Sequence, residues 1–118
     1  MTVIEEAKRG RVPSSIEAVA KREGIDPARL AALVAAGRVV IPRNIRREGQ
    51  EPTGIGELLT TKVNVNVGTS QSLDSPEAEV ERALAAAEAG ADAVMDLSTG
   101  GDLDAVRRMI LDLSLIHI

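Results

Sequence analysis

The first 37 residues carry apolar side chains at helical spacing, interrupted by glycine and proline. This pattern predicts three short helices, over residues 2–10, 13–24 and 26–37. Thr2 and Glu5 have the spacing of a capping box, in which each side chain bonds a free N–H of the first turn. The third segment begins with Asp-Pro, a favoured pair at a helix start, and ends at a glycine that suits a helix end. The N-terminal part is therefore expected to be mostly helical.

A short extended segment and a linker are expected after these helices. Residues 39–42 (VVIP) are apolar and end at a proline, which favours a brief strand-like piece. Between residues 43 and 56, prolines and glycines stand among charged residues, a composition typical of a loop. We expect a boundary near residue 60, which separates an N-terminal domain of residues 1–60 from a second domain of residues 61–118.

The polar and apolar pattern changes after this boundary. Residues 61–68 (TKVNVNVG) alternate between apolar and polar side chains, as half-buried strands do. A helix over 75–90, a strand over 91–97 and a helix over 102–113 are expected next. The two strands begin about 30 residues apart, the usual length of one strand–helix repeat. Because parallel sheets need more than two strands, this half is predicted to begin a larger α/β array.

The first of these strands presents two amides on one face. Val63, Val65 and Val67 point to one side, whereas Asn64 and Asn66 point to the other. In a barrel with outer helices the valines would face the helices, so the amides would face inward near a polar site. A heterocycle or phosphate ligand could satisfy a buried amide. The simpler interpretation is that both amides are exposed on a sheet edge or bonded to backbone.

The second strand offers a partner for these amides. If its valine faces the helices, then Ala93, Met95 and Leu97 face inward, and Met95 lies one strand–helix repeat after Asn66. Active sites of such barrels collect at the carboxyl ends of the strands. A methionine in a strand is nonetheless more often a core residue than a ligand contact. Residues 98–101 (STGG) could receive an anion on free N–H groups, although they match neither the phosphate-loop nor the dinucleotide pattern.

Composition excludes several kinds of chemistry. The chain has no cysteine, so it can form no disulfide and supply no thiolate to zinc or to an iron–sulfur cluster. It also has no Phe, Trp or Tyr, so any core must be aliphatic. The net charge of −4, without a basic stripe, argues against nucleic acid as a partner. Neither a signal sequence nor an apolar run of membrane-spanning length is visible, so no membrane association and a cytoplasmic location are expected.

The end of the chain is predicted to carry no function. His117 is the only histidine, and a single histidine at a chain end is a poor candidate for a metal ligand or a base. Residues 113–118 (LSLIHI) also match the translation of a common transposon-derived sequencing adapter. We therefore expect these six residues not to be biological sequence.

Four segments together resemble one enzyme family. Residues 62–70 (KVNVNVGTS) and 88–100 (EAGADAVMDLSTG) closely resemble the phosphomethylpyrimidine synthase family, and 17–26 (EAVAKREGID) and 37–45 (GRVVIPRNI) look like its N-terminal region. The resemblance extends to about Leu111. Many bacterial members have Gly-Asn-Ser where this chain has GTS after the strand, so the chain looks like a shorter, anaerobe-type branch.

The resemblance implies a radical enzyme of thiamin biosynthesis. Members convert 5-aminoimidazole ribonucleotide to 4-amino-5-hydroxymethyl-2-methylpyrimidine phosphate, a carbon–carbon lyase reaction that uses S-adenosylmethionine and a 4Fe–4S cluster. They also carry zinc, and they are typically homodimers of a (β/α)8 barrel behind an N-terminal domain. The resemblance implies that Asn66 and Met95 bind the nucleotide substrate. It places the cluster cysteines and zinc histidines later in such proteins, so this chain is expected to be an N-terminal fragment, with a truncated barrel, that is inactive alone.

Two other functions stay open from the sequence. One is a fragment of the related enzyme that makes 5-hydroxybenzimidazole from the same substrate, because the anaerobe-type branch is similar to both. The other is a small non-enzymatic helical interaction module that is complete at this length. The inward amides and the final open-ended helix argue against the module.

Overall fold

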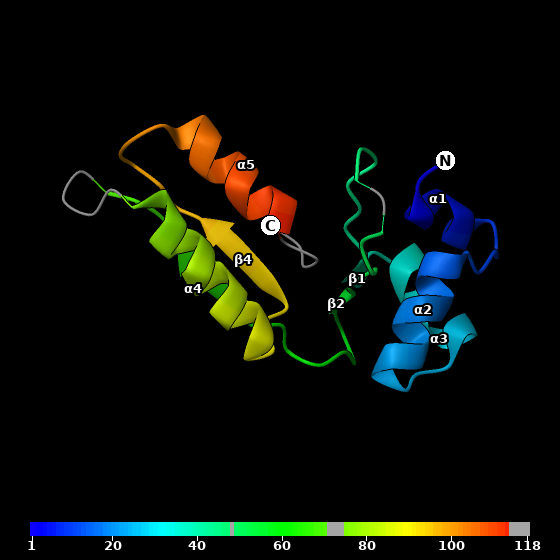
Figure 1. Ribbon diagram of the computed structural model, residues 1–118. Helices are drawn as coiled ribbons and strands as arrows, with labels where there is room; N and C mark the ends of the chain where they lie inside the picture. Colours follow the sequence, from blue (N-terminus) through cyan, green and yellow to red (C-terminus); the bar gives the residue numbers. More distant parts are fainter. Residues whose placement is uncertain (48, 71–74, 114–118) are drawn as a thin grey trace. The chain divides into compact units, whose positions relative to one another are not determined.

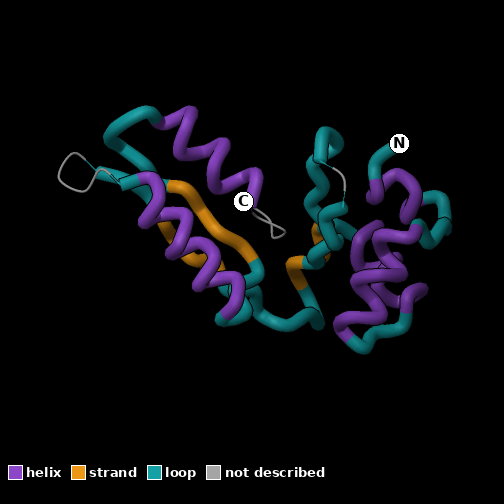
Figure 2. Tube along the Cα trace, in the orientation of Figure 1, coloured by secondary structure: helices purple, strands orange, loops and turns teal. Residues whose placement is uncertain are grey.

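The computed structural model describes residues 1–47, 49–70 and 75–113 of a mixed α/β protein with two small sheets (Figures 1 and 2). The chain divides into two compact units, residues Met1–Thr61 and Lys62–Ile118. Each unit has its own hydrophobic core. The predicted adapter-derived segment lies almost wholly outside the described residues, and so does His117.

The first unit contains three helices and a short antiparallel strand pair. The helices are α1 (Val3–Lys8), α2 (Ser14–Glu23) and α3 (Pro27–Ala35). Strands β1 (Val39–Val40) and β2 (Ile55–Gly56) pair in antiparallel orientation. The three expected helices are thus confirmed, and the apolar segment after them does form a strand.

The helices begin and end where local sequence signals place them. The capping box forms, because the Thr2 N–H donates to Glu5 Oε2 (2.7 Å) while the Glu5 N–H donates to Thr2 Oγ1 (3.4 Å). The Thr2 N–H and the Thr2 hydroxyl both donate to the Glu5 carboxylate and hold its pKa below the ordinary value, and the bond from the Thr2 backbone is the main cause. The Asp26 side chain accepts the Arg29 N–H at 2.9 Å, and α2 ends at Gly24 with φ of +68°. Each bond satisfies a backbone group that a helix end leaves free.

The segment expected to be only a linker contributes β2. Gly56 makes this pairing possible, because a Cβ on it would lie 2.3 Å from the carbonyl oxygen of Arg38. A strand of two residues is too short to show a periodic pattern, which is why the sequence does not predict it. The core of this unit is aliphatic, as the composition requires. Its buried residues are Ala7, Ile16, Val19, Ala20, Leu30, Ala31, Val34, Val39 and Ile41.

The second unit has the order strand, helix, strand, helix. Its elements are β3 (Asn64–Val67), α4 (Pro76–Glu88), β4 (Ala93–Asp96) and α5 (Leu103–Leu113). The two strands are parallel neighbours, and Figure 2 draws both in orange. A crossover helix joins them, which is the usual connection between adjacent parallel strands.

The helices of this unit pack on one face of the strand pair. The buried core consists of Val67, Val94, Val106 and Ile110, with Val80, Ala83 and Ala86 packed against it. Val67 and Val94 therefore lie on the helix-covered face, as the alternation predicts, whereas Val63, which precedes β3, is 55% exposed. Leu103 stands three residues before Val106, at the spacing of one helix face, yet it is 38% exposed and is not part of this core. Among the described residues, no helix is both long enough and apolar enough to cross a membrane.

Candidate functional site

The uncovered face of the β3–β4 pair brings the predicted site residues together. Asn66 of β3 and Met95 of β4 are register partners. Partners in adjacent strands lie about 5 Å apart and project to the same side of a sheet. Met95 is 47% exposed, and Asn66 is exposed too. The two residues, distant in the sequence, therefore form adjoining parts of one open surface.

Two further residues extend this surface, which we call the open sheet face (Asn64, Asn66, Met95 and Leu97). Asn64 Nδ2 donates to Asn66 Oδ1 at 3.2 Å, which leaves the Asn66 amino group free to donate elsewhere. Leu97, which directly follows the last residue of β4, is 52% exposed. The amides are exposed, as the simpler interpretation expects. Their position beside two exposed apolar side chains is also what a mixed polar and apolar ligand requires.

The strand ends approach each other closely at Gly68. Gly68 has φ of +154°, and a Cβ on it would lie 2.6 Å from both the Leu97 carbonyl carbon and the Ser98 nitrogen. The Leu97 N–H donates to the Val67 carbonyl at 2.7 Å just before this point. Only a residue without a side chain fits between the two backbones here.

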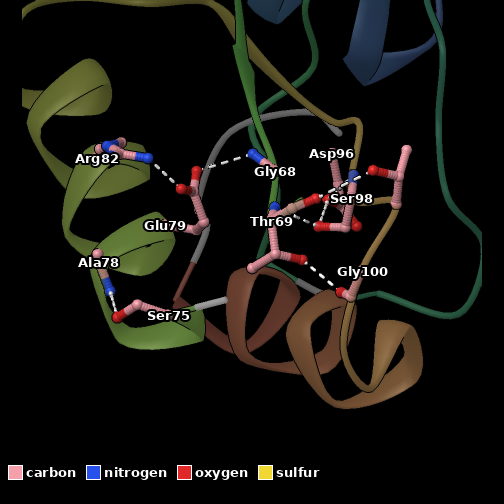
Figure 3. Close-up of polar contacts among 10 residues, drawn as sticks. Gly68, Thr69, Ser75, Ala78, Glu79, Arg82, Asp96, Ser98 and Gly100 are labelled. Carbon is pink, nitrogen blue, oxygen red and sulfur yellow. Dashed lines mark hydrogen bonds and ion pairs between the residues drawn. The ribbon is translucent and has the colours of Figure 1, made fainter. Parts of the chain in front are cut away.

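A buried threonine then joins the two loops that follow the strands (Figure 3). Thr69 is 1% exposed, and its hydroxyl donates to the Gly100 carbonyl at 2.7 Å. Its N–H donates to Ser98 Oγ at 3.1 Å, and its carbonyl accepts the Thr99 N–H at 2.8 Å. Backbone and side chain of one residue thereby fix the loop after β4 against the loop after β3.

The chain of bonds continues to a carboxylate at the end of β4. The Ser98 hydroxyl donates to Asp96 Oδ1 at 2.5 Å, and the Ser98 N–H donates to the same oxygen at 3.0 Å. Because the Ser98 hydroxyl also accepts the Thr69 N–H, Thr69, Ser98 and Asp96 form a chain of hydrogen bonds that ends at the Asp96 carboxylate. Hydrogen bonds in such chains strengthen one another.

Helix α4 contributes a second carboxylate, Glu79. Its side chain is 3% exposed, and Oε2 accepts the Gly68 N–H at 2.8 Å. Its other oxygen pairs with Arg82, which is exposed (Figure 3). Glu79 lies in the first turn of α4, where an acidic side chain ordinarily complements the helix dipole, so its position in the sequence does not by itself predict this bond. A signal was present, however, because Glu79 shares a helix face with Ala83 and Ala86, both of which pack against the core.

The loop over residues 98–101 is occupied by protein contacts rather than arranged as an open anion site. Thr69 bonds to three of its residues, as described above. Asp102 accepts the Ala105 N–H at 3.0 Å, so an acidic side chain already caps α5. A carboxylate at this position disfavours a second anion.

The residues of this chain do not fit a metal cluster. No group of three or more His, Cys, Asp or Glu side chains that could hold a metal ion occurs within residues 1–47, 49–70 and 75–113. The whole sequence also lacks cysteine, the residue that ligates iron–sulfur clusters. Any cluster used by a full-length protein would therefore be held by cysteines outside this sequence.

The fold and the open sheet face together define an α/β chain whose strand–helix units carry an exposed surface of amide and apolar side chains beside the strand ends. The chain belongs to the radical SAM ThiC family, whose family model matches residues 2–118. The family resemblance predicted from the four sequence segments is thus confirmed.

Curated relatives agree with this assignment. The chain is 52% identical over 112 residues to a phosphomethylpyrimidine synthase of Archaeoglobus fulgidus. It is 54% identical over 111 residues to phosphomethylpyrimidine synthase 1 of Methanosarcina mazei, and 47% identical over 111 residues to the Thermococcus gammatolerans enzyme. These alignments cover 94–95% of this chain but 26% of each relative, so the chain spans about a quarter of their length.

Proposed function

We propose that this chain is the N-terminal part of a phosphomethylpyrimidine synthase, which converts 5-aminoimidazole ribonucleotide to 4-amino-5-hydroxymethyl-2-methylpyrimidine phosphate. Relatives from three different genera, which share about half of its residues, carry that name. The radical chemistry is a property of the whole enzyme. In the full-length parent, S-adenosylmethionine and a 4Fe–4S cluster would supply the initiating radical, and zinc would be held by residues outside this chain.

The second unit is proposed to begin a (β/α)8 barrel. Parallel strands with helices on one face are the building unit of such barrels. The open sheet face of β3 and β4 would then line the barrel interior, and further strands would pair with the two outer strand edges. Under this proposal residues 1–60 form a separate N-terminal domain, and the parent acts as a cytoplasmic homodimer.

The observation that carries the proposal is the pairing of Asn66 with Met95 on the open sheet face. An amide that donates two N–H groups can bond oxygen or nitrogen acceptors of the imidazole ribonucleotide. A thioether beside it is polarizable and packs well against the flat face of a heterocycle. We propose that these two side chains contact the substrate at the strand ends, where barrel active sites form.

The test uses the full-length enzyme that contains this sequence, reconstituted with its cofactors. Asn66→Ala and Met95→Ala should each raise the KM for 5-aminoimidazole ribonucleotide at least about tenfold, the loss expected for one good contact of about 1.4 kcal/mol. Glu81→Ala, on the exposed side of α4, is the control and should leave KM unchanged. An unchanged KM in both site variants would contradict the substrate contacts.

Product analysis separates the two related enzymes. Mass spectrometry of the reaction mixture should show the pyrimidine phosphate. Formation of 5-hydroxybenzimidazole instead would assign the chain to the benzimidazole-forming enzyme. Absence of both products from a fully reconstituted enzyme would refute the proposed activity.

A further inference from the structure

Glu79 is a buried charge that core packing does not require. Its side chain is 3% exposed and lies on the same helix face as Ala83 and Ala86, which pack on the core. An ionised carboxylate loses favourable hydration on burial, so it persists only with good partners. A small apolar residue would fill this helix position without that cost. The role of Glu79 therefore lies in the specific bonds that it makes.

One of those bonds acts on the end of β3. Gly68 follows Val67, the last residue of the strand, and its N–H donates to Glu79 Oε2 at 2.8 Å. The backbone of Gly68 also passes so close to Leu97 and Ser98 that a Cβ would lie 2.6 Å from their atoms. Glu79 thus anchors the end of β3 at a position where the two backbones lie too close together for a side chain to fit between them.

The second partner of Glu79 has a different character. Arg82 lies on the same helix, and its side chain is 57% exposed. An exposed guanidinium can turn towards water and still remain solvated, so its ion pair contributes little to the fixed geometry. The hydrogen bond to Gly68 is therefore the contact through which Glu79 can control the position of the strand.

We propose that Glu79 is a positioning residue for nucleotide binding, which acts through the Gly68 N–H to hold Asn66 and Met95 side by side. The proposal rests on the proposed function, because it takes the open sheet face as the nucleotide-binding surface. Asn66 precedes Gly68 with only Val67 between them, so a shift of the strand end displaces its amide directly. The length of the glutamate side chain matters for this role, and its charge does not.

Two conservative substitutions separate length from charge in the full-length enzyme. Glu79→Asp keeps the charge but shortens the side chain, so it loses the bond to Gly68. Glu79→Gln loses the charge but keeps an acceptor oxygen at the same reach. Affinity for 5-aminoimidazole ribonucleotide is measured by calorimetry, and KM and kcat by steady-state kinetics. Glu81→Ala on the same helix is the matched control.

We expect Glu79→Asp to weaken nucleotide binding and raise KM at least about tenfold, with kcat at saturation within about threefold. Glu79→Gln should stay within about threefold of the unmodified enzyme in all three quantities. A merely structural role would lower the melting temperature of Glu79→Asp while leaving the affinity of the folded enzyme unchanged, and that result overturns the proposal. Equal losses in both variants, or a loss in Glu79→Gln alone, overturn it as well.

Two further variants complete the test. If Glu79→Asp does not fold, Arg82→Ala takes its place, because Arg82→Ala removes the ion pair and keeps the bond from Gly68 to Glu79. A tenfold loss of nucleotide affinity in Arg82→Ala then overturns the proposal. Retained affinity in Arg82→Ala supports it. Asn66→Ala examines the nucleotide-binding surface itself. Normal affinity in Asn66→Ala contradicts the proposed substrate contact of Asn66, whereas weak binding there with normal binding in Glu79→Asp contradicts only the positioning role.

Discussion

The hydroxyl of Thr69 donates to the carbonyl oxygen of Gly100 at 2.7 Å, in a position where Thr69 is 1% exposed. This bond joins the loop after β3 to the loop after β4. Both loops follow directly from strands that carry the open sheet face. The stability of the second unit and the geometry of its proposed binding surface therefore depend on the same few contacts.

Replacing Thr69 by valine should destabilise the second unit by about 1–3 kcal/mol. The substitution preserves shape but removes the hydroxyl, so the buried Gly100 carbonyl loses this partner. Urea unfolding of the chain followed by far-ultraviolet circular dichroism measures the loss. Thr99→Val is the matched control, because Thr99 is exposed and its hydroxyl reaches the Thr69 carbonyl only at 3.5 Å. Equal effects at both positions would contradict the importance of the buried bond.

Replacing Gly68 by alanine should be more damaging, with a cost of about 3 kcal/mol or more. The added Cβ would meet backbone atoms of Leu97 and Ser98 at 2.6 Å, and backbone cannot move aside as a flexible side chain can. Gly90→Ala separates this clash from conformational strain, because Gly90 has φ of +94° but nothing within 4 Å of its Cβ position. We expect the control to lose about 1–2 kcal/mol. The same unfolding experiment compares the two.

Replacing Ile110 by alanine should cost about 2–5 kcal/mol, because it opens a cavity in a small aliphatic core. Ile110 is 1% exposed and is one of four buried residues described in that cluster. Leu103→Ala on the same helix should cost much less, since Leu103 is 38% exposed. Hydrogen exchange of the α4 and β4 amides measures both effects. A larger effect at Leu103 would show that α5 packs with a different face.

Glu5 should titrate below its ordinary pKa in the folded chain. The Thr2 N–H and hydroxyl bond its carboxylate and stabilise the charged form. Because the folded pKa is the lower one, the box stabilises the chain at pH values above the ordinary pKa of 4.5 and loses that effect as pH falls through the folded value. The Glu5 side-chain carbon shift in an NMR titration reports this pKa. A Thr2→Gly variant removes the hydroxyl and should raise the pKa part of the way back.

Several features could be predicted because they depend on neighbours in the sequence. The helix starts at Asp26, Ser75 and Asp102 were expected, and each of these side chains accepts an N–H of its own first turn. The helix-covered valine face of β3 was also expected, because alternation is a local property. Asn66 and Met95 could be placed at matching ends of their strands for the same reason, and their role as substrate contacts stays a prediction.

Contacts between distant residues could not be predicted in this way. The bonds from Gly68 to Glu79 and from Thr69 to Gly100 join residues whose proximity is created only by the packed strand–helix–strand unit. The β1–β2 pairing joins segments on either side of a long loop, and two-residue strands carry no periodic signal. A polar residue on an otherwise apolar helix face, as at Glu79, is the kind of local inconsistency that can point to such a contact.

The purely aliphatic cores also determine how this molecule can be observed. A chain without Trp, Tyr or Phe has essentially no absorbance at 280 nm and no intrinsic fluorescence. A single tryptophan introduced at Met95 would therefore be the sole emitter in the chain, placed on the open sheet face beside Asn66. Its emission would report directly on whatever covers that surface, with no background from the rest of the chain.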